Sequence, residues 1–246
     1  ADFRASAIVD FFINNLTSWA DPRINPTYGK NGVNRWGIAS GPAGYVGVPS
    51  AYAIGSGAPV KQAYFYSDAQ SGNPFSLQTD ASTGVIMNVA EVDFILAEAA
   101  ARGWINGTGE NYYYKGIADG INYWIPSLYA NGNDASVRDY ASKGDFDWNN
   151  ALPLDSKTVG ANSKLEQIHL QKYYALFLVD FQQWFEYTRT GHPLLPKGAS
   201  LLNGGKMPVR LYYPILVQST NPTNYKNVLA AQGADDVNTL MWWQKP

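Results

Sequence analysis

Hydrophobic and polar positions between 88 and 125 alternate with the helical period and predict a pair of helices. Asn88 and Glu91 form a capping-box pattern at the start of the first helix, and Gly103 supplies its stop. An apolar stripe follows the cap through Val92, Ile95, Leu96, Ala99 and Ala100. The opposite face is also apolar or small, at Phe94, Ala97 and Ala101. We therefore expect a helix that is packed on two sides.

The second helix of the pair is expected to begin after Thr108 and to end before Pro126. Its apolar positions are Tyr113, Ile117, Ile121 and Trp124. Gly116 and Gly120 lie where a neighbouring helix can approach closely. The pair has the helix-turn-helix layout and roughly the 34-residue length of one tetratricopeptide unit, without that unit's consensus residues.

A long helix is predicted over 163–191, beginning at the capping box of Ser163 and Glu166 and ending at Gly191. A break near Val179 and Asp180 is an alternative. Weaker patterns predict an amphipathic helix within 1–25, a short strand over 209–213 and a short helix over 221–233. The fold class is therefore mainly α, with tetratricopeptide-like helix pairs, a loop-rich subdomain and few short strands.

The segment 28–87 has a different character, because it holds ten of the 23 glycines and has no helical period. Its aromatic residues argue against disorder and favour a functional loop region. Aromatic residues make up 14% of the chain. Sugars bind through their CH faces on aromatic rings, so the candidate ligand-binding residues are Trp36, Tyr45, Tyr52, Tyr64 and Tyr66. The alternative is that some of these rings pack inside the helix pairs.

Composition excludes several classes of function. A net charge of -2 disfavours binding to nucleic-acid backbones. The chain has no cysteine, and its two histidines, His169 and His192, are too far apart for a helical two-histidine metal site. No nucleotide-binding or cofactor motif is present, so neither a metal nor a cofactor is expected. No run of 18 apolar residues occurs.

Carboxylates give only weak signals for catalysis or metal binding. Glu98 is expected to pair with Arg102, and Glu186 with Arg189. His169, with Glu166 and Lys172 on the same predicted helix, is expected to be a structural histidine whose polar atoms are satisfied. The 127–162 connection is acidic at positions 134, 139, 145, 147 and 155. Its Asp145 and Asp147 suggest calcium, but the oxygens of an EF-hand loop do not follow them.

Ordered fragments of the sequence resemble the SusD/RagB outer-membrane lipoproteins of glycan-utilisation systems. The fragments are EVDFILAEA at 91–99, RGW at 102–104, YYKGI at 113–117, QKY at 171–173, WFEYTRTGHP at 184–193, RLYYP at 210–214 ahead of NP at 221–222, and the closing WW at 242–243. The chain departs from the family pattern at Gln182 and Thr188, where the loss of a buried ion pair is implied. Family members are about twice as long, so this single domain, 1–246, is expected to be the C-terminal half of a SusD-like protein.

The resemblance implies a protein without catalytic activity. Such a protein captures oligosaccharides or polysaccharides at the cell surface and delivers them to a TonB-dependent outer-membrane transporter. It also implies an outer-membrane location through a lipid anchor that is not present in this chain. Two alternatives remain open from the residues themselves. One is a glycoside-active enzyme that uses acidic residues of the 134–155 connection, and the other is a protein-interaction scaffold whose aromatic rings are all internal.

Overall fold

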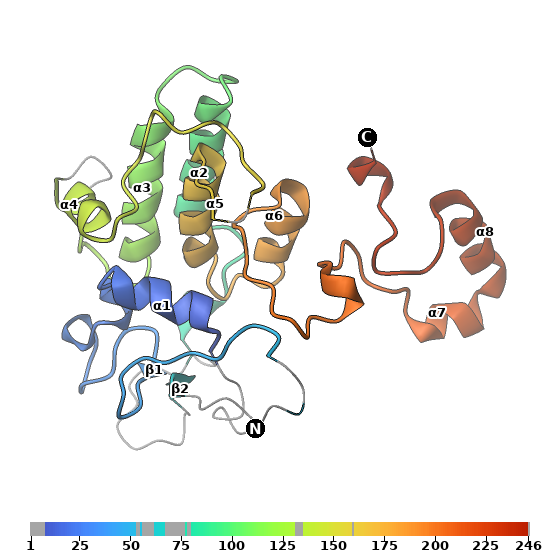
Figure 1. Ribbon diagram of the computed structural model, residues 1–246, viewed down its shortest axis with the longest axis horizontal. Coiled ribbons are helices and arrows are strands. Elements are labelled where there is room, and N and C mark those ends of the chain that lie inside the picture. Colours follow the sequence, from blue (N-terminus) through green and yellow to red (C-terminus); the bar gives the residue numbers. More distant parts are fainter. Residues whose placement is uncertain are drawn as a thin grey trace. The chain divides into compact units, whose positions relative to one another are not determined.

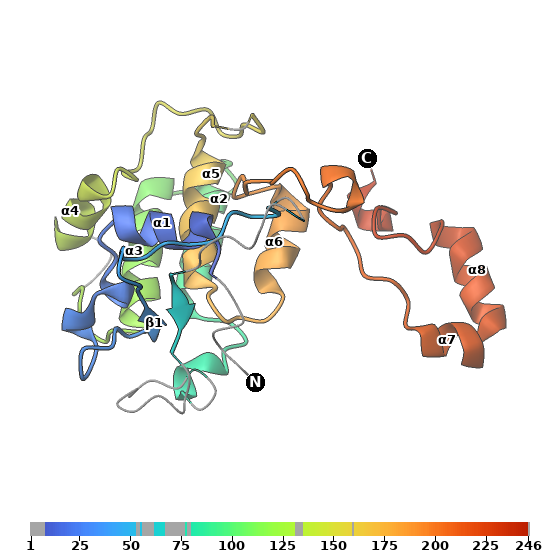
Figure 2. The ribbon, with the colours of Figure 1, turned by 60° about the horizontal axis from the view of Figure 1, so that its bottom comes forward.

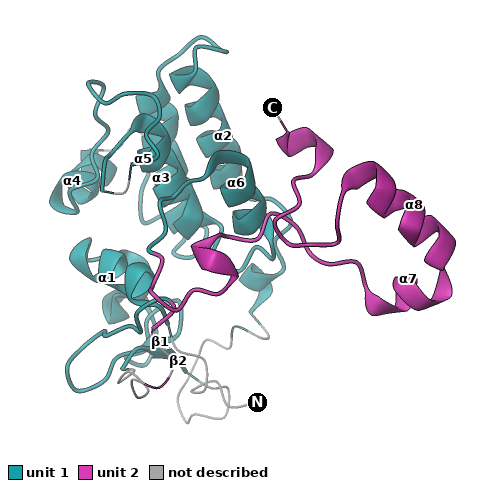
Figure 3. Ribbon diagram, turned by 45° about the vertical axis from the view of Figure 1, so that its right-hand side comes forward, with its two compact units in different colours: residues 1–50, 58–196 teal, residues 51–57, 197–246 magenta. Residues whose placement is uncertain are grey.

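The computed structural model describes residues 8–52, 55, 62–66, 77, 80–130, 135–158 and 160–245. The chain divides into two compact units, which Figure 3 shows in different colours. Unit 1 comprises residues 1–50 and 58–196, and unit 2 comprises residues 51–57 and 197–246. Part of the loop-rich segment 28–87, including 67–76, lies outside the described residues.

Unit 1 is helical, as its sequence pattern predicts. Its α-helices are α1 (Asp10–Ser18), α2 (Val89–Ala101), α3 (Gly109–Asn122), α4 (Ala135–Lys143), α5 (Lys164–Ala175) and α6 (Gln182–Thr190). Short 3-10 turns occur at Pro22–Ile24, Pro26–Tyr28 and Ala81–Thr83. Helices α2, α3 and α5 pack against one another, and both views of the ribbon show them side by side (Figures 1 and 2). The predicted mainly α fold class is confirmed.

The three predicted N-caps are present. The Asn88 side chain accepts a hydrogen bond from the Glu91 backbone N–H at 2.8 Å. Thr108 caps α3, and the Ser163 hydroxyl accepts from the Glu166 N–H at 3.1 Å to begin α5. Each cap satisfies a backbone donor that the first turn of a helix leaves without a partner, which explains why these helices begin where they do.

The glycines of α3 allow the close approach that their positions predict. A Cβ built on Gly116 would lie 2.9 Å from the Phe94 ring of α2, and one on Gly120 would lie 3.2 Å from the Ala175 Cβ of α5. Because both distances are shorter than ordinary contacts, the small residues set how closely α3 packs on its two neighbours.

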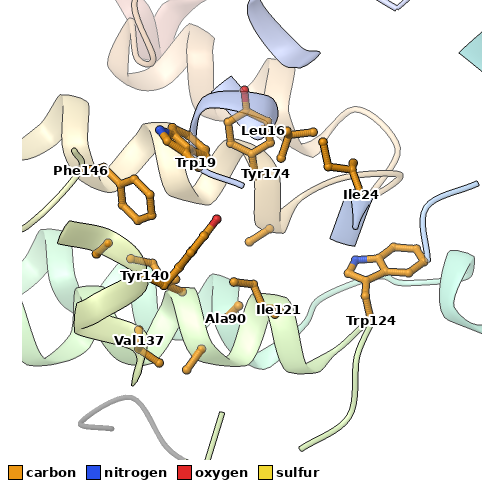
Figure 4. Packing of buried hydrophobic residues seen from close by; sticks show 14 of the residues in the cluster. Leu16, Trp19, Ile24, Ala90, Ile121, Trp124, Val137, Tyr140, Phe146 and Tyr174 are labelled. Carbon is orange, nitrogen blue, oxygen red and sulfur yellow. The ribbon is translucent and has the colours of Figure 1, made fainter. Parts of the chain in front are cut away.

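The core of unit 1 gathers side chains from α1, α2, α3, α4 and α5. Figure 4 shows Leu16 of α1 and Trp19 directly after α1 above Ile121 of α3, and the Tyr174 ring of α5 lies between Leu16 and Trp19. A two-stranded antiparallel sheet adds to this core: β1 (Ile38–Ala39) pairs with β2 (Tyr64–Phe65) in the register Ile38 to Phe65. Ile38 is buried and Phe65 packs against the cluster.

The predicted long helix over 163–191 is wrong in its continuity, and the alternative break is correct. Helix α5 ends at Ala175 and α6 begins at Gln182. Between them, Leu178 and Asp180 have φ angles of 63° and 39°, in the left-handed region that interrupts the helical hydrogen-bond ladder. The turn brings Phe177 onto the core, where its ring packs on Trp36 with centroids 4.3 Å apart.

Helix α2 is apolar on two sides, as predicted, but within this chain it is packed on only one of them. Its buried face is formed by Ala90, Phe94 and Ala97 together with three acidic residues, whereas Val89, Val92 and Ile95 are exposed. Phe185 of α6 and Phe181 directly before α6 are likewise exposed. The predicted apolar stripe is therefore real, but within this chain it faces outward.

Unit 2 contains α7 (Ile215–Thr220), α8 (Pro222–Gln232) and 3-10 turns at Asn203–Gly205 and Trp242–Gln244. The predicted helix over 221–233 is confirmed as α8, with Pro222 at its first position and Gly233 after its last. The predicted strand over 209–213 is wrong. In this segment the Val209 N–H donates to the Val237 carbonyl and the Tyr213 N–H donates to the Asp235 carboxylate. These backbone groups therefore bind neighbouring loops and do not pair with another strand.

Candidate functional site

Three tyrosines of unit 1 lie around the small sheet and form what we call the tyrosine cluster, Tyr45, Tyr64 and Tyr66. Because side chains alternate along a strand, Phe65 faces the core while Tyr64 and Tyr66 share the other side. The two rings meet edge to face, with centroids 6.3 Å apart. All three side chains are half-buried, so part of each ring is open to solvent.

Tyr45 joins the cluster because its segment runs beside the approach to β2. The backbone N–H groups of Gln62 and Ala63 both donate to the Val46 carbonyl, at 3.1 and 2.9 Å. The Tyr45 hydroxyl donates to the Ile24 carbonyl at 3.1 Å and accepts from the Asn34 amide at 3.0 Å. Burial raises the pKa of Tyr45, the Asn34 hydrogen bond offsets part of this shift, and the nearby Tyr66 adds to it. Tyr45 is therefore a fixed, neutral phenol.

The other two predicted aromatic residues are placed differently. Trp36 has 0% of its surface exposed, and its ring packs against Phe12, Trp124 and Phe177. The prediction that Trp36 binds a ligand directly is therefore not supported, because the core covers both faces of the ring. Tyr52 is exposed and belongs to unit 2.

The tyrosine cluster has the chemistry of a sugar-binding surface. Phenol rings present apolar faces to sugar CH groups, and their hydroxyls both donate and accept hydrogen bonds. Gly37 and Gly41 lie on the adjoining loop, and the Tyr66 N–H donates to the Gly37 carbonyl at 2.8 Å. The cluster contains no carboxylate, histidine or amine, so its chemistry suits the binding and orientation of a neutral ligand.

A second group of polar residues is a buried ion cluster between α2, α5 and α6. Glu98 accepts from Arg189 and Arg102, and Glu186 contacts Arg189 at 2.9 Å and Lys172 at 3.1 Å. The predicted pairs of Glu98 with Arg102 and of Glu186 with Arg189 are confirmed. Burial opposes ionisation of both carboxylates, but contacts with His169 and Arg189 hold the pKa of Glu98 well below its usual range. Arg189 and Lys172 likewise lower the pKa of Glu186.

His169 lies inside this ion cluster with 1% of its surface exposed. Its Nε2 lies 3.3 Å from Glu98 and its Nδ1 lies 3.7 Å from Glu186, but neither nitrogen has a hydrogen-bond partner among the described residues. Burial lowers the pKa of His169 despite the two carboxylates, so the ring is neutral at pH 7. The structural position agrees with the prediction, but the expected hydrogen bonds do not form. Glu166, expected near His169, binds His192 instead.

The same three residues, Glu98, His169 and Glu186, offer ligand atoms that lie within 4.8 Å of one another, as a metal site would require. Their charges argue against that use. The three carboxylates of Glu91, Glu98 and Glu186 face three cations, Arg102, Lys172 and Arg189. A divalent cation would add two positive charges to a buried group that is already balanced. The cluster fits a structural role that holds α6 against α2 and α5.

Gln182, one of the two departures from the family pattern, belongs to this region. Its side-chain amide donates to Glu91 at 2.7 Å. At this position, where the family pattern implies the loss of an ion pair, a hydrogen bond from a neutral donor is present, and Lys172 lies 3.8 Å from Glu91.

His192 forms a separate polar contact at the end of α6. Its Nδ1 lies 2.5 Å from Glu166 and its Nε2 lies 2.7 Å from Asp155, and its side chain is fully buried. Glu166 also accepts from the Leu194 N–H. These contacts fasten the chain after α6 to the start of α5, which is a structural task.

The described carboxylates of the 134–155 connection have partners that suit structure more than hydrolysis. Asp139 pairs with Lys143, Asp147 accepts from the Tyr114 hydroxyl at 3.1 Å, and Asp155 binds His192 and Lys157. Asp134 lies outside the described residues. In the part of the connection that the structure describes, Asp145 is the acidic residue without such a partner.

Comparison with known proteins identifies the class of protein. The family model described as "starch-binding associating with outer membrane", SusD-like, matches residues 1–214. The chain belongs to this SusD-like family, and the resemblance found in the sequence is confirmed.

Solved structures agree on the fold. A SusD homolog from Bacteroides fragilis is similar with a TM-score of 0.65 and 22% identity, over 97% of this chain and 52% of that one. A chitin-binding SusD homolog from Flavobacterium johnsoniae gives a TM-score of 0.62 and 21% identity, over 97% of this chain and 49% of that one. At these identities the likeness establishes the fold alone. The chain spans about half the length of these structures.

No curated protein matches the sequence at a significant level. Among the described residues, no helix combines the length and the apolar character needed to cross a bilayer.

Proposed function

We propose that this chain is part of a cell-surface glycan-binding protein without catalytic activity. Membership of a family described by starch binding at the outer membrane carries the proposal. The half-buried tyrosine cluster supports it, because three neutral phenol rings on a fixed sheet suit sugar CH faces and hydroxyl groups. The chitin-binding homolog is a second reason to expect a polysaccharide ligand.

The proposed role has a place and a partner. The protein captures oligosaccharide or polysaccharide at the outer-membrane surface, where a lipid anchor on the longer protein holds it, and delivers the glycan to a TonB-dependent transporter. The resemblance to the SusD/RagB lipoproteins supports both statements. In the described part of the chain, the buried ion cluster is balanced by its own side chains and needs no cofactor.

The test is calorimetric titration of the purified chain with maltoheptaose and with chitohexaose. Tyr64→Ala and Tyr66→Ala should each weaken the binding of whichever glycan binds by about tenfold, the change expected from the loss of about 1.4 kcal/mol of stacking and hydrogen bonding. Tyr187→Ala is the matched control, because Tyr187 is a half-buried tyrosine on α6, outside the cluster. Equal losses of glycan affinity in all three variants would show that the tyrosine cluster is not the binding site.

Two other functions give different results. A glycoside-active enzyme would release reducing ends from the same oligosaccharides, and Asp145→Asn and Asp155→Asn would abolish the release. A protein-interaction scaffold would bind neither glycan. The hypothesis of a protein-interaction scaffold requires every aromatic ring of 28–87 to be internal. Tyr28 and Tyr52 are exposed, which argues against this hypothesis.

A further inference from the structure

A hollow of about 450 Å³ lies in unit 1, apart from the residues of the tyrosine cluster. Its walls come from the last turns of α1, the loop that follows α4 and the start of α5. The volume falls within the range of roughly 300–1,000 Å³ that is typical of small-molecule sites.

The floor of the hollow is aromatic. The rings of Trp19 and Phe146 meet there with centroids 4.8 Å apart, and both are almost buried. Figure 4 shows the two rings beside each other in the core. A Cβ built on Gly144 would lie 2.2 Å from Phe146 and 3.0 Å from Trp19. The turn after α4 is therefore pressed onto these rings, and only glycine fits at this position.

The rim of the hollow is polar. Asn15 and Ser18 line it from α1, and Asn162 lines it from the segment before α5. Asp145 follows Gly144 with a φ of 59°, a strained conformation for a residue other than glycine. Its carboxylate is exposed and has no hydrogen-bond or ion-pair partner in the part of the chain that the structure describes. The rim thus offers amide donors, amide acceptors and a carboxylate acceptor at separate points.

The charge of the hollow favours a neutral ligand over an anion. Its one cation, Lys143, is exposed and pairs with Asp139 at 2.5 Å, so a phosphate or a carboxylate would have to compete with Asp139 for it. Asp145 adds a negative charge that repels anions. A ligand that combines apolar faces with many hydroxyl groups fits both the aromatic floor and the polar rim.

We propose that the hollow is a second carbohydrate subsite, which holds one or two neutral sugar units of a bound glycan. The sugar lies over the edges of Trp19 and Phe146. Its hydroxyls donate to Asp145 and exchange hydrogen bonds with Asn15 and Asn162. This inference rests on the proposed function, because it assigns a further place on the chain to the same class of ligand.

The experiment fills the hollow without removing any core contact. Ser18→Trp places a bulky side chain at the exposed rim, and Asn162→Ala removes one amide. Thr17→Trp is the control, since Thr17 is exposed on the same turn of α1 but does not line the hollow. Each protein is titrated with maltoheptaose, chitohexaose and inorganic phosphate, and its thermal transition shows that it is folded.

We expect Ser18→Trp to lower the affinity for the bound glycan by about tenfold or more, and Asn162→Ala to lower it by severalfold. Thr17→Trp should bind the glycan with wild-type affinity. Wild-type affinity in both Ser18→Trp and Asn162→Ala overturns the subsite and leaves the glycan-binding function standing. Failure of the wild type to bind either glycan overturns both. If phosphate binds to the wild type but not to Ser18→Trp, the hollow is an anion site, and this result also overturns the inference.

Discussion

Arg189 of α6 donates two hydrogen bonds to Glu98 of α2, from Nη1 to Oε1 at 3.0 Å and from Nη2 to Oε2 at 2.6 Å. A fork of two parallel hydrogen bonds is the strongest geometry that an arginine and a carboxylate can adopt. Glu98 is almost completely buried, whereas Arg189 is half-exposed. The contact therefore joins the buried Glu98 of the α2–α3 helix pair to α6. The turn between α5 and α6 allows α6 to reach this position.

Glu98→Gln should destabilise the chain by about 2–4 kcal/mol at pH 7, because it leaves Arg189 and Arg102 facing a group without charge. Urea denaturation measures the change. Glu110→Gln is the control, because the Glu110 pair with Arg138 is partly exposed and should contribute at most about 1 kcal/mol. Equal losses in the two variants would contradict a stabilising role for the buried fork.

His169 should make the stability of the chain fall as the pH drops below its usual pKa of 6.5. Burial lowers its pKa in the folded state, so between the two values the unfolded state binds more protons and stability decreases with falling pH. Glu98 and Glu186 act with the same sign at lower pH, below their usual value of 4.5. Asp93 acts with the opposite sign, since burial raises its pKa to about 6 and its contribution is lost as the pH rises through 6.

The difference between wild type and His169→Gln reports the histidine between pH 6.5 and pH 5, because Glu98 and Glu186 titrate at lower pH and Asp93 is common to both proteins. We expect the stability advantage of the wild type to be constant above pH 6.5 and to shrink between pH 6.5 and pH 5 in urea titrations. An advantage that grows on acidification would show that the folded chain favours the charged ring, in conflict with its burial.

Zinc should leave the thermal transition unchanged. Glu98, His169 and Glu186 have the spacing of a metal site, but Arg102, Lys172 and Arg189 already balance the nearby carboxylates. Differential scanning fluorimetry with and without 100 µM zinc chloride, roughly the concentration that saturates a site of micromolar affinity, checks this. A rise in the transition temperature that disappears in His169→Gln would establish a metal site.

The sequence predicts the start of α2, α3 and α5 because their caps are local. Asn88, Thr108 and Ser163 each satisfy a donor within three residues, and this needs no knowledge of the rest of the fold. The face that a helix buries depends on its neighbours. Val92 and Ile95 form the apolar stripe of α2, yet Phe94 packs inward because Gly116 leaves room for its ring.

The candidate site was predictable as a segment but not residue by residue. Trp36 and Tyr64 both lie among glycines in the sequence, and only the pairing of β1 with β2 decides that one ring enters the core and the other flanks it. The hollow beside Trp19 was missed, because its walls come from segments more than 100 residues apart. Gly144 before Asp145 was the local signal of a tight turn there.

Gly116→Ala should lower the stability of the chain, although alanine is the better helix former. The added Cβ would lie 2.9 Å from the Phe94 ring, and the strain of about 1–3 kcal/mol outweighs the gain of about 1 kcal/mol in helix propensity. Gly84→Ala is the control, because no atom lies within 4 Å of its added Cβ and its φ of -91° suits any residue. The urea midpoints of the two variants and of the wild type measure the change in stability. A neutral Gly116→Ala would mean that α2 and α3 can separate at no cost.

Asp235→Ala should loosen unit 2 and leave unit 1 unchanged. The Asp235 carboxylate accepts hydrogen bonds from Arg210 at 3.0 Å, from the Tyr213 N–H at 3.1 Å and from the Tyr225 hydroxyl at 3.0 Å. Neither α7 nor α8 has a buried residue, so these polar contacts hold the two helices in place of an apolar core.

Hydrogen exchange measures the loosening helix by helix. Amides of α7 and α8 should exchange about tenfold faster in Asp235→Ala, the change that the loss of about 1.4 kcal/mol produces, while amides of α2 and α3 keep their protection. Asp236→Ala is the matched control, because among the described residues the Asp236 side chain accepts only from the Asn238 N–H, at 2.7 Å. If both variants exchange alike, Asp235 does not organise unit 2. If α2 and α3 also lose protection, the two units unfold together and their stabilities are coupled.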